Sequence, residues 1–97
     1  MIKNLAYFFE SYYFPASKVY YPTKEKLWDF TLQTEGEDIK VEICKNIEWV
    51  LGQDTDEQKD VLRYINQLTY MGPIHFGTLE EMLVYLRIML TYFRENS

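Results

Sequence analysis

The chain has 97 residues, a formal net charge of −5, and a composition that is 47% hydrophobic and 26% charged. This length is enough for one globular domain and too short for two, so we expect a single domain over residues 1–97. An acidic protein this small is a poor ligand for nucleic acid, because phosphates repel it, and its charge favours basic partners instead.

Cysteine content and the first residues bear on the compartment. Cys44 is the single cysteine and cannot form a disulfide within the chain, which favours a reducing environment. Met1 is followed by a mixed sequence without the basic and apolar regions of a signal peptide. No apolar run approaches the ~18 residues that a membrane span needs. We therefore expect a soluble cytoplasmic protein with no membrane partner.

The segment LAYFFESYYF, residues 5–14, holds six aromatic residues and predicts a helix over about residues 2–13. Pro15 ends this helix, because proline pushes the residue before it out of the helical region. Residues 14–22 show no hydrophobic period and are predicted to form a loop. Four side chains of the helix follow the i, i+3, i+4, i+7 spacing of an inward face, and we expect them in the core: Leu5, Phe8, Phe9 and Tyr12.

A second helix is predicted over about residues 24–34, with Thr23 as its N-cap. The alternative is a β-hairpin over residues 27–43, because apolar and polar residues alternate there as they do on strands. We favour helices, since apolar residues continue at helical spacing from residue 39 well past the length of a strand. These apolar residues are Ile39, Ile43, Ile47 and Val50 or Leu51.

The remaining helix boundaries follow from capping residues. The third predicted helix starts after Asp38 as its N-cap and stops at Gly52. The fourth and fifth each start at a capping box, Thr55–Gln58 and Thr78–Glu81, and they end at Gly72-Pro73 and near residue 94. Their inward residues are Val61, Leu62, Ile65 and Leu68, then Leu79, Met82, Leu83, Leu86, Leu90 and Phe93. Five short helices with brief loops predict an all-α fold.

Few residues suit catalysis or metal binding. His75 is the single histidine, and we expect it to cap or pack in a loop. One histidine and one cysteine make neither a zinc site nor a Cys–His pair, and we expect Cys44 to be a small buried side chain. The four glycines lie singly at helix ends, so the chain has no phosphate-binding loop. We expect no enzymatic activity, no cofactor and no metal.

The acidic residues concentrate between residues 35 and 60, where nine acids and three lysines give a charge of −6. Helix macrodipoles explain acids in the first turns of helices, at ~0.3–1 kcal/mol each, but not the other acids of this stretch. We therefore expect a connected acidic surface that steers a basic protein to it. The residues we expect to contact this partner are Glu35, Glu37, Asp38, Glu42, Asp56 and Asp60.

Tyrosines form a second candidate feature, because one inward stripe does not accommodate Tyr7, Tyr13, Tyr20 and Tyr21 together. Tyrosine is a frequent hot-spot residue of interfaces, since it combines rigid area with a hydroxyl group. The alternative is that the loop over residues 14–22 folds its tyrosines over the core. We take Tyr13, Tyr20 and Tyr21 as secondary candidates for partner contact.

Three segments of the chain resemble the immunity proteins of bacterial contact-dependent growth inhibition systems. LAYFFESYYF resembles their N-terminal signature Leu-x-x-Phe-Phe-x-x-Tyr-Phe, whose places are taken here by Leu5, Phe8, Phe9, Tyr12 and Tyr13. VEICKNIEWVLGQDTDEQ, residues 41–58, is similar to a helix and acidic linker of the family, and GTLEEMLVYLRIML, residues 77–90, to its closing helix. The chain differs at residues 14–17, FPAS, where many members have His-Gln-Asp-Trp, and at Met82, near a usual tryptophan.

The resemblance implies a helical, cytoplasmic protein without catalytic activity that binds and neutralises one cognate toxin domain. Such a partner is often a nuclease, and we expect a basic C-terminal toxin domain of the RNase type. With the acidic surface, the resemblance suggests that carboxylates cover the toxin's active site or its substrate-binding surface. The alternative function is a small helical adaptor or regulatory subunit that docks a partner helix in an apolar groove.

Overall fold

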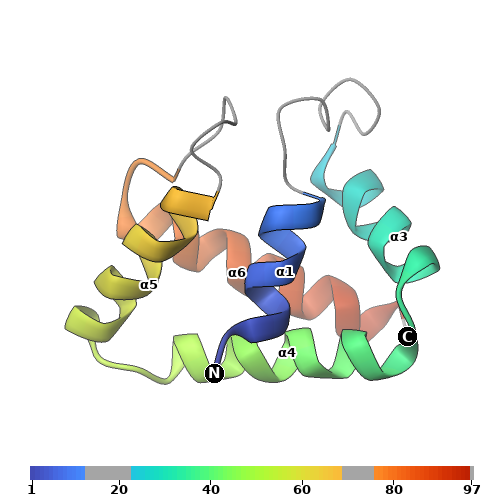
Figure 1. The fold of residues 1–97 in the computed structure, drawn as a ribbon, viewed down its shortest axis with the longest axis horizontal. Helices are drawn as coiled ribbons and strands as arrows, with labels where there is room; N and C mark the ends of the chain where they lie inside the picture. The colour runs from blue at the N-terminus through green and yellow to red at the C-terminus, as the bar shows by residue number, and fades with distance from the viewer. Residues whose placement is uncertain (13–22, 69–75, 97) are drawn as a thin grey trace.

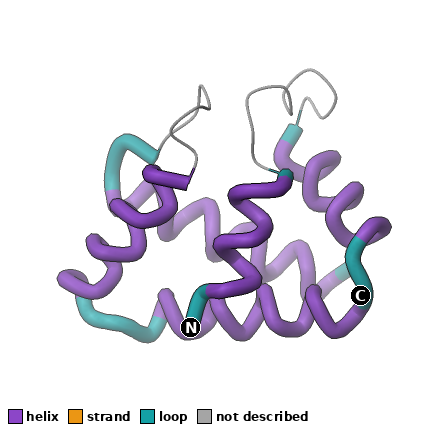
Figure 2. Tube along the Cα trace, in the orientation of Figure 1, coloured by secondary structure: helices purple, strands orange, loops and turns teal. Residues whose placement is uncertain are grey.

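The computed structural model describes residues 1–12, 23–68 and 76–96. Within these ranges the chain forms helices and no strand, so the predicted all-α fold is confirmed and the alternative hairpin over residues 27–43 is wrong (Figure 2). The helices are α1 (Lys3–Ser11), α3 (Lys24–Thr34), α4 (Glu37–Leu51), α5 (Thr55–Leu68) and α6 (Leu79–Glu95).

Helix α1 stands on α4 between α5 and α3 and packs mainly against α4 and α5 (Figure 1). Helix α4 lies along one edge of the molecule, and α6 passes behind α1 and contacts α3, α4 and α5. The Cα trace has a radius of gyration of 12.5 Å. Because α1 packs against both α4 and α5, one of its faces enters the core and a neighbouring face borders α5.

The inward face of α1 is aromatic, as predicted. Leu5, Phe8 and Phe9 have no exposed surface, and Tyr12 is buried. The rings of Phe8 and Phe9 meet edge to face at 5.2 Å between centroids, and Phe9 also meets the ring of Phe76 edge to face. Edge-to-face pairs add stabilisation beyond the burial of area. Most of the opening aromatic segment that the structure describes is therefore core.

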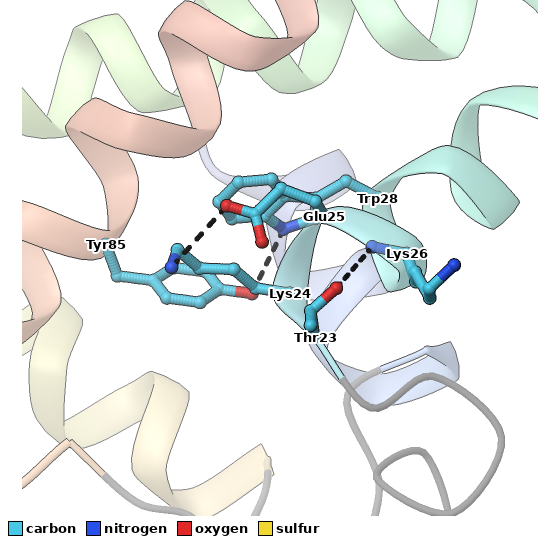
Figure 3. Close-up of polar contacts among 6 residues, drawn as sticks. All are labelled: Thr23, Lys24, Glu25, Lys26, Trp28 and Tyr85. Carbon is cyan, nitrogen blue, oxygen red and sulfur yellow. Dashed lines mark hydrogen bonds and ion pairs between the residues drawn. The ribbon is translucent and has the colours of Figure 1, made fainter.

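Helix α3 is held to α6 by Trp28, which is completely buried. Its indole Nε1 donates to the hydroxyl of Tyr85 at 3.1 Å (Figure 3). The hydroxyl oxygen of Thr23 accepts from the backbone N–H of Lys26 at 3.2 Å, so the predicted N-cap is confirmed. The apparent strand alternation fails because Phe30, two residues after Trp28, is exposed.

Two predicted N-caps are wrong. Helix α4 begins at Glu37 after Gly36, so Asp38 lies inside its first turn and caps nothing. At α5, a carboxylate oxygen of Asp54 accepts from the backbone N–H of Glu57 at 2.9 Å. Thr55 is therefore the first helical residue, and the predicted capping box with Gln58 does not form.

Three other predicted helix ends are confirmed or nearly so. Thr78 accepts from the backbone N–H of Glu81 at 3.1 Å, and the carboxylate of Glu81 accepts from that of Gly77 at 2.9 Å. This is a capping box in which the returning bond reaches one residue further back than usual. Gly52 is the C-cap of α4, and α6 ends at Glu95, one residue beyond the expected position.

Candidate protein-binding surface

The acidic residues predicted to bind a partner fall into two groups along the chain. One group precedes α4 or lies in its first two turns, and the other belongs to the first two turns of α5, which follows the opposite end of α4. The 15 residues of α4 span about 22 Å at 1.5 Å per residue. We call the two groups the α4 cluster, which comprises Glu35, Glu37, Asp38 and Glu42, and the α5 cluster, which comprises Asp56 and Asp60.

Ion pairs within the chain neutralise several of these carboxylates. Glu37 and Lys40 approach to 2.8 Å, and Glu42 and Lys45 to 3.7 Å, each pair one helical turn apart. Two further pairs join Asp60 to Arg63 and Glu48 to Arg94. Among the described residues, Asp38, Asp56 and Glu57 have no ion-pair partner. These three carboxylates are thus the most available of the stretch to a basic protein.

Glu35 has a structural partner already. Its carboxylate accepts from the hydroxyls of Tyr12 and Tyr7, the latter at 3.2 Å, and so ties α1 to the turn between α3 and α4. Burial, followed by the hydrogen bond to Glu35, raises the pKa of Tyr12 far above its ordinary value. The phenol therefore stays protonated and donating at neutral pH. Tyr13, Tyr20, Tyr21 and His75 lie outside the described residues.

A groove of about 620 Å³ runs between α1 and α5, and we call it the α1–α5 groove. It was not predicted from the sequence. Its lining comes from α1 and the residues before it, from the end of α4 and from the first turns of α5. The lining residues are Met1, Ile2, Lys3, Ala6, Tyr7, Glu10, Trp49, Glu57, Asp60, Val61 and Tyr64.

Two facing stripes at helical spacing build this groove. On α1, Lys3, Tyr7 and Glu10 follow i, i+4, i+7, beside the buried face of the helix. On α5, Glu57, Asp60 and Tyr64 follow i, i+3, i+7, beside the buried residues of that helix. Neither stripe is apolar, so a search for hydrophobic periodicity does not find it. The sequence gives one indication of the groove: Tyr7 does not belong to the inward-facing stripe of its helix.

The chemistry of the groove combines exposed rings with carboxylates. The side chains of Tyr7 and Tyr64 are 43% and 46% exposed, and Trp49 is half-buried. Glu10, Glu57 and Asp60 supply three carboxylates to the lining, and Lys3 supplies its single basic side chain. Glu10 and Glu57 have no ion-pair partner among the described residues. Aromatic rings beside unpaired carboxylates are suited to bind a cationic side chain with an apolar stem.

Cys44 is half-buried beside the α4 cluster, where the sequence predicted a buried side chain. Burial raises the pKa of its thiol above the ordinary value, which favours the unreactive protonated form. Within residues 1–12, 23–68 and 76–96, no group of three or more His, Cys, Asp or Glu residues is placed to hold a metal ion. None of the helices in these ranges has the length and apolar character needed to cross a bilayer.

Comparison of the chain with protein-family models, curated proteins and solved structures found no match in any of the three.

Proposed function

We propose that this chain is an immunity protein that binds a cognate toxin domain and neutralises it by covering a basic surface. The partner is the basic C-terminal domain of a large secreted toxin, a nuclease of the RNase type. The observation that carries the proposal is the α1–α5 groove, in which exposed rings lie beside carboxylates that lack partners within the described chain. The resemblance of three segments to immunity proteins of contact-dependent growth inhibition systems supports it further.

Neutralisation in this proposal needs no reaction by the chain. A nuclease holds phosphates with lysine and arginine side chains, and carboxylates of a bound protein occupy those side chains in place of phosphate. Asp56 and Glu57 lie in the first turn of α5 without ion-pair partners among the described residues. Opposite charge on the two surfaces raises the association rate, while exposed aromatic side chains such as Tyr7 and Tyr64 supply desolvated contacts that slow dissociation.

Part of the groove lining supports a second candidate function. Ile2, Ala6 and Val61 give part of the lining an apolar character, with Ala6 and Val61 at its buried base, and a partner helix could dock against it. The chain would then be an adaptor or regulatory subunit. Salt separates the two functions, because capture by charge weakens as ionic strength rises and apolar docking responds little.

The test is affinity capture from the cells that naturally produce the chain, followed by production of each captured partner alone and together with the chain. We expect recovery of the C-terminal domain of a very large secreted protein. That domain alone should arrest growth of a bacterial host, and the chain should restore it. Recovery of a housekeeping enzyme or regulator that does not arrest growth would favour the adaptor function instead.

A further inference from the structure

We infer that the end of the α1–α5 groove nearest α4 binds an arginine side chain of the partner, with the guanidinium at the carboxylates of Glu57 and Asp60 and over the indole of Trp49. This inference deepens the proposed function and relies on it for the identity of the partner. It names the chemistry of the segment that enters the groove, namely a basic, arginine-bearing one.

The arrangement of the helices places these three residues at the same end. Both α1 and α5 begin on the side of α4 (Figure 1), and Trp49 belongs to the last turn of α4. Glu57 lies in the first turn of α5, and Asp60 follows one turn later on the same face. All three line the groove. An indole and two carboxylates therefore border one end of a single cavity.

The charges and shapes favour arginine over other occupants. The carboxylate of Asp60 already accepts from the guanidinium of Arg63 on the same helix. Because this ion pair is exposed, the guanidinium of a partner can displace that of Arg63 at little cost in free energy. Glu57 is exposed and has no ion-pair partner among the described residues. A guanidinium is planar, stacks on aromatic rings and bonds carboxylates through two N–H groups at once, whereas an ammonium does neither as well. The groove's apolar lining suits the methylene stem.

Among the lining residues that the structure describes, Lys3 has the one basic side chain, and it provides a directional test. It lies in the first turn of α1, on the side of α4, so its ammonium opposes a guanidinium bound at this end. Replacing Lys3 by alanine should therefore tighten arginine binding, whereas replacing Glu57 by glutamine should weaken it. Long-range attraction of cations would change in the same two directions, so the discriminating comparison is with Asp38→Asn, which removes the same charge as Glu57→Gln at a position outside the groove.

The experiment uses the full chain, labelled with 15N, and a short neutral-ended peptide containing one arginine between glycine and serine residues. The indole N–H resonance of Trp49, assigned by its loss in Trp49→Phe, reports on the groove, and that of Trp28 is the internal control because Trp28 is fully buried. We expect the arginine peptide to shift the Trp49 resonance and to leave that of Trp28 unchanged. A peptide with citrulline, the uncharged analogue of arginine, should bind about tenfold more weakly.

Variants complete the test. Glu57→Gln should weaken the arginine peptide by about tenfold, Lys3→Ala should strengthen it severalfold, and the matched control Asp38→Asn, in the first turn of α4, should leave it unchanged. Equal binding of the citrulline peptide, no shift at Trp49, or indifference to Glu57→Gln would overturn the inference. If the peptide binds as expected but no captured domain arrests growth, the proposed function alone fails. If the chain protects cells while Glu57→Gln leaves toxin affinity intact, the arginine site alone fails.

Discussion

Asn46, Gln58 and Asn66 use their side-chain amides to satisfy backbone groups of neighbouring elements. The side-chain oxygen of Asn46, in the middle of α4, accepts from the backbone N–H groups of Asn4 and Leu5 at 3.0 and 3.1 Å, which caps α1 from a distance of 41 residues in sequence. Gln58 donates to the carbonyl of Val50 in the last turn of α4. The side chain of Asn66 donates to the backbone carbonyl of Phe76 and accepts from the backbone N–H of the same residue.

The cap supplied by Asn46 is expected to be the largest single polar contribution to stability among the described residues. Ile2, the N-cap residue of α1, makes no side-chain cap bond, so Asn46→Ala leaves two N–H groups in the first turn without acceptors. We expect the free energy of unfolding to fall by about 2–3 kcal/mol. Urea denaturation followed by circular dichroism measures this, with the exposed Gln67→Ala on α5 as control. A loss below that of the control would show that α1 does not need the cap.

Tyr12 makes the free energy of unfolding depend on pH, and the environment of its phenol determines whether that free energy rises or falls with pH. Burial and the bond to Glu35 place the pKa of the phenol in the folded state above its ordinary value of 10.0, so its contribution to stability is complete below pH 10 and declines as the pH rises toward the folded-state pKa. Tyr12→Phe should lower the free energy of unfolding by about 1–2 kcal/mol at neutral pH. The difference in this free energy between the variant and the native chain should become smaller above about pH 10. Urea denaturation at neutral pH and again above about pH 10 measures the difference. Tyr64→Phe, which removes the hydroxyl of an exposed phenol, is the control. A gap that stays constant with pH would contradict it.

At the scale of elements, the sequence was sufficient to place each helix and insufficient to fix every start. Apolar spacing located α1, α4, α5 and α6 because the same spacing buries their side chains in one core, whereas α3 was located by its N-cap, Thr23. Helix α4 starts two residues earlier than its predicted cap implies, with Gly36 at the N-cap position, so Asp38 lies within the first turn. At α5, aspartate is the stronger N-cap, so Asp54 takes the position expected of Thr55 and leaves Gln58 free to bond to α4.

This difference at α5 is itself testable. Asp54→Ala removes the carboxylate that accepts from Glu57, and we expect a loss of about 1 kcal/mol. Thr55→Ala should change the free energy of unfolding by less than half of that, because Thr55 is an exposed first helical residue. Asp54→Ser keeps a capping oxygen and should recover most of the loss. If Thr55→Ala cost more than Asp54→Ala, the capping box predicted from the sequence would be the correct description.

The candidate site was less predictable than the fold, for a geometric reason. The acids between residues 35 and 60 are close in sequence, but α4 is about 22 Å long and separates the acids at its start from those of α5. The α1–α5 groove joins residues some 50 positions apart, and its existence depends on how two helices pack rather than on the period of either. Tyr7 and Glu57 were visible in the sequence, and only their packing makes them neighbours of one cavity.

At the scale of the whole molecule, net charge and its placement have different consequences. A charge of −5 attracts a basic protein from any direction, whereas two separate acidic clusters determine which face meets it. Asp38, a member of the α4 cluster, and Glu57, which follows Asp56 of the α5 cluster in the chain, are matched probes of the two regions. Each is exposed, lies in the first turn of a helix and lacks an ion-pair partner within the described residues, but only Glu57 lines the α1–α5 groove.

Reversal of either charge therefore separates global attraction from local contact. Asp38→Lys and Glu57→Lys change the net charge by the same amount and forfeit a similar macrodipole interaction, about 0.3–1 kcal/mol. If the toxin docks on the groove, Glu57→Lys should lower its association rate constant by about tenfold in low salt and Asp38→Lys by a much smaller factor. Stopped-flow or surface plasmon resonance kinetics with the captured toxin domain measures both rate constants.

The difference between the two association rate constants should become smaller toward 1 M salt, where the Debye length falls to about 3 Å and only contact interactions persist. Equal effects of the two variants at low salt would show that the chain attracts its partner by net charge alone, and a larger effect of Asp38→Lys would move the interface to the α4 cluster.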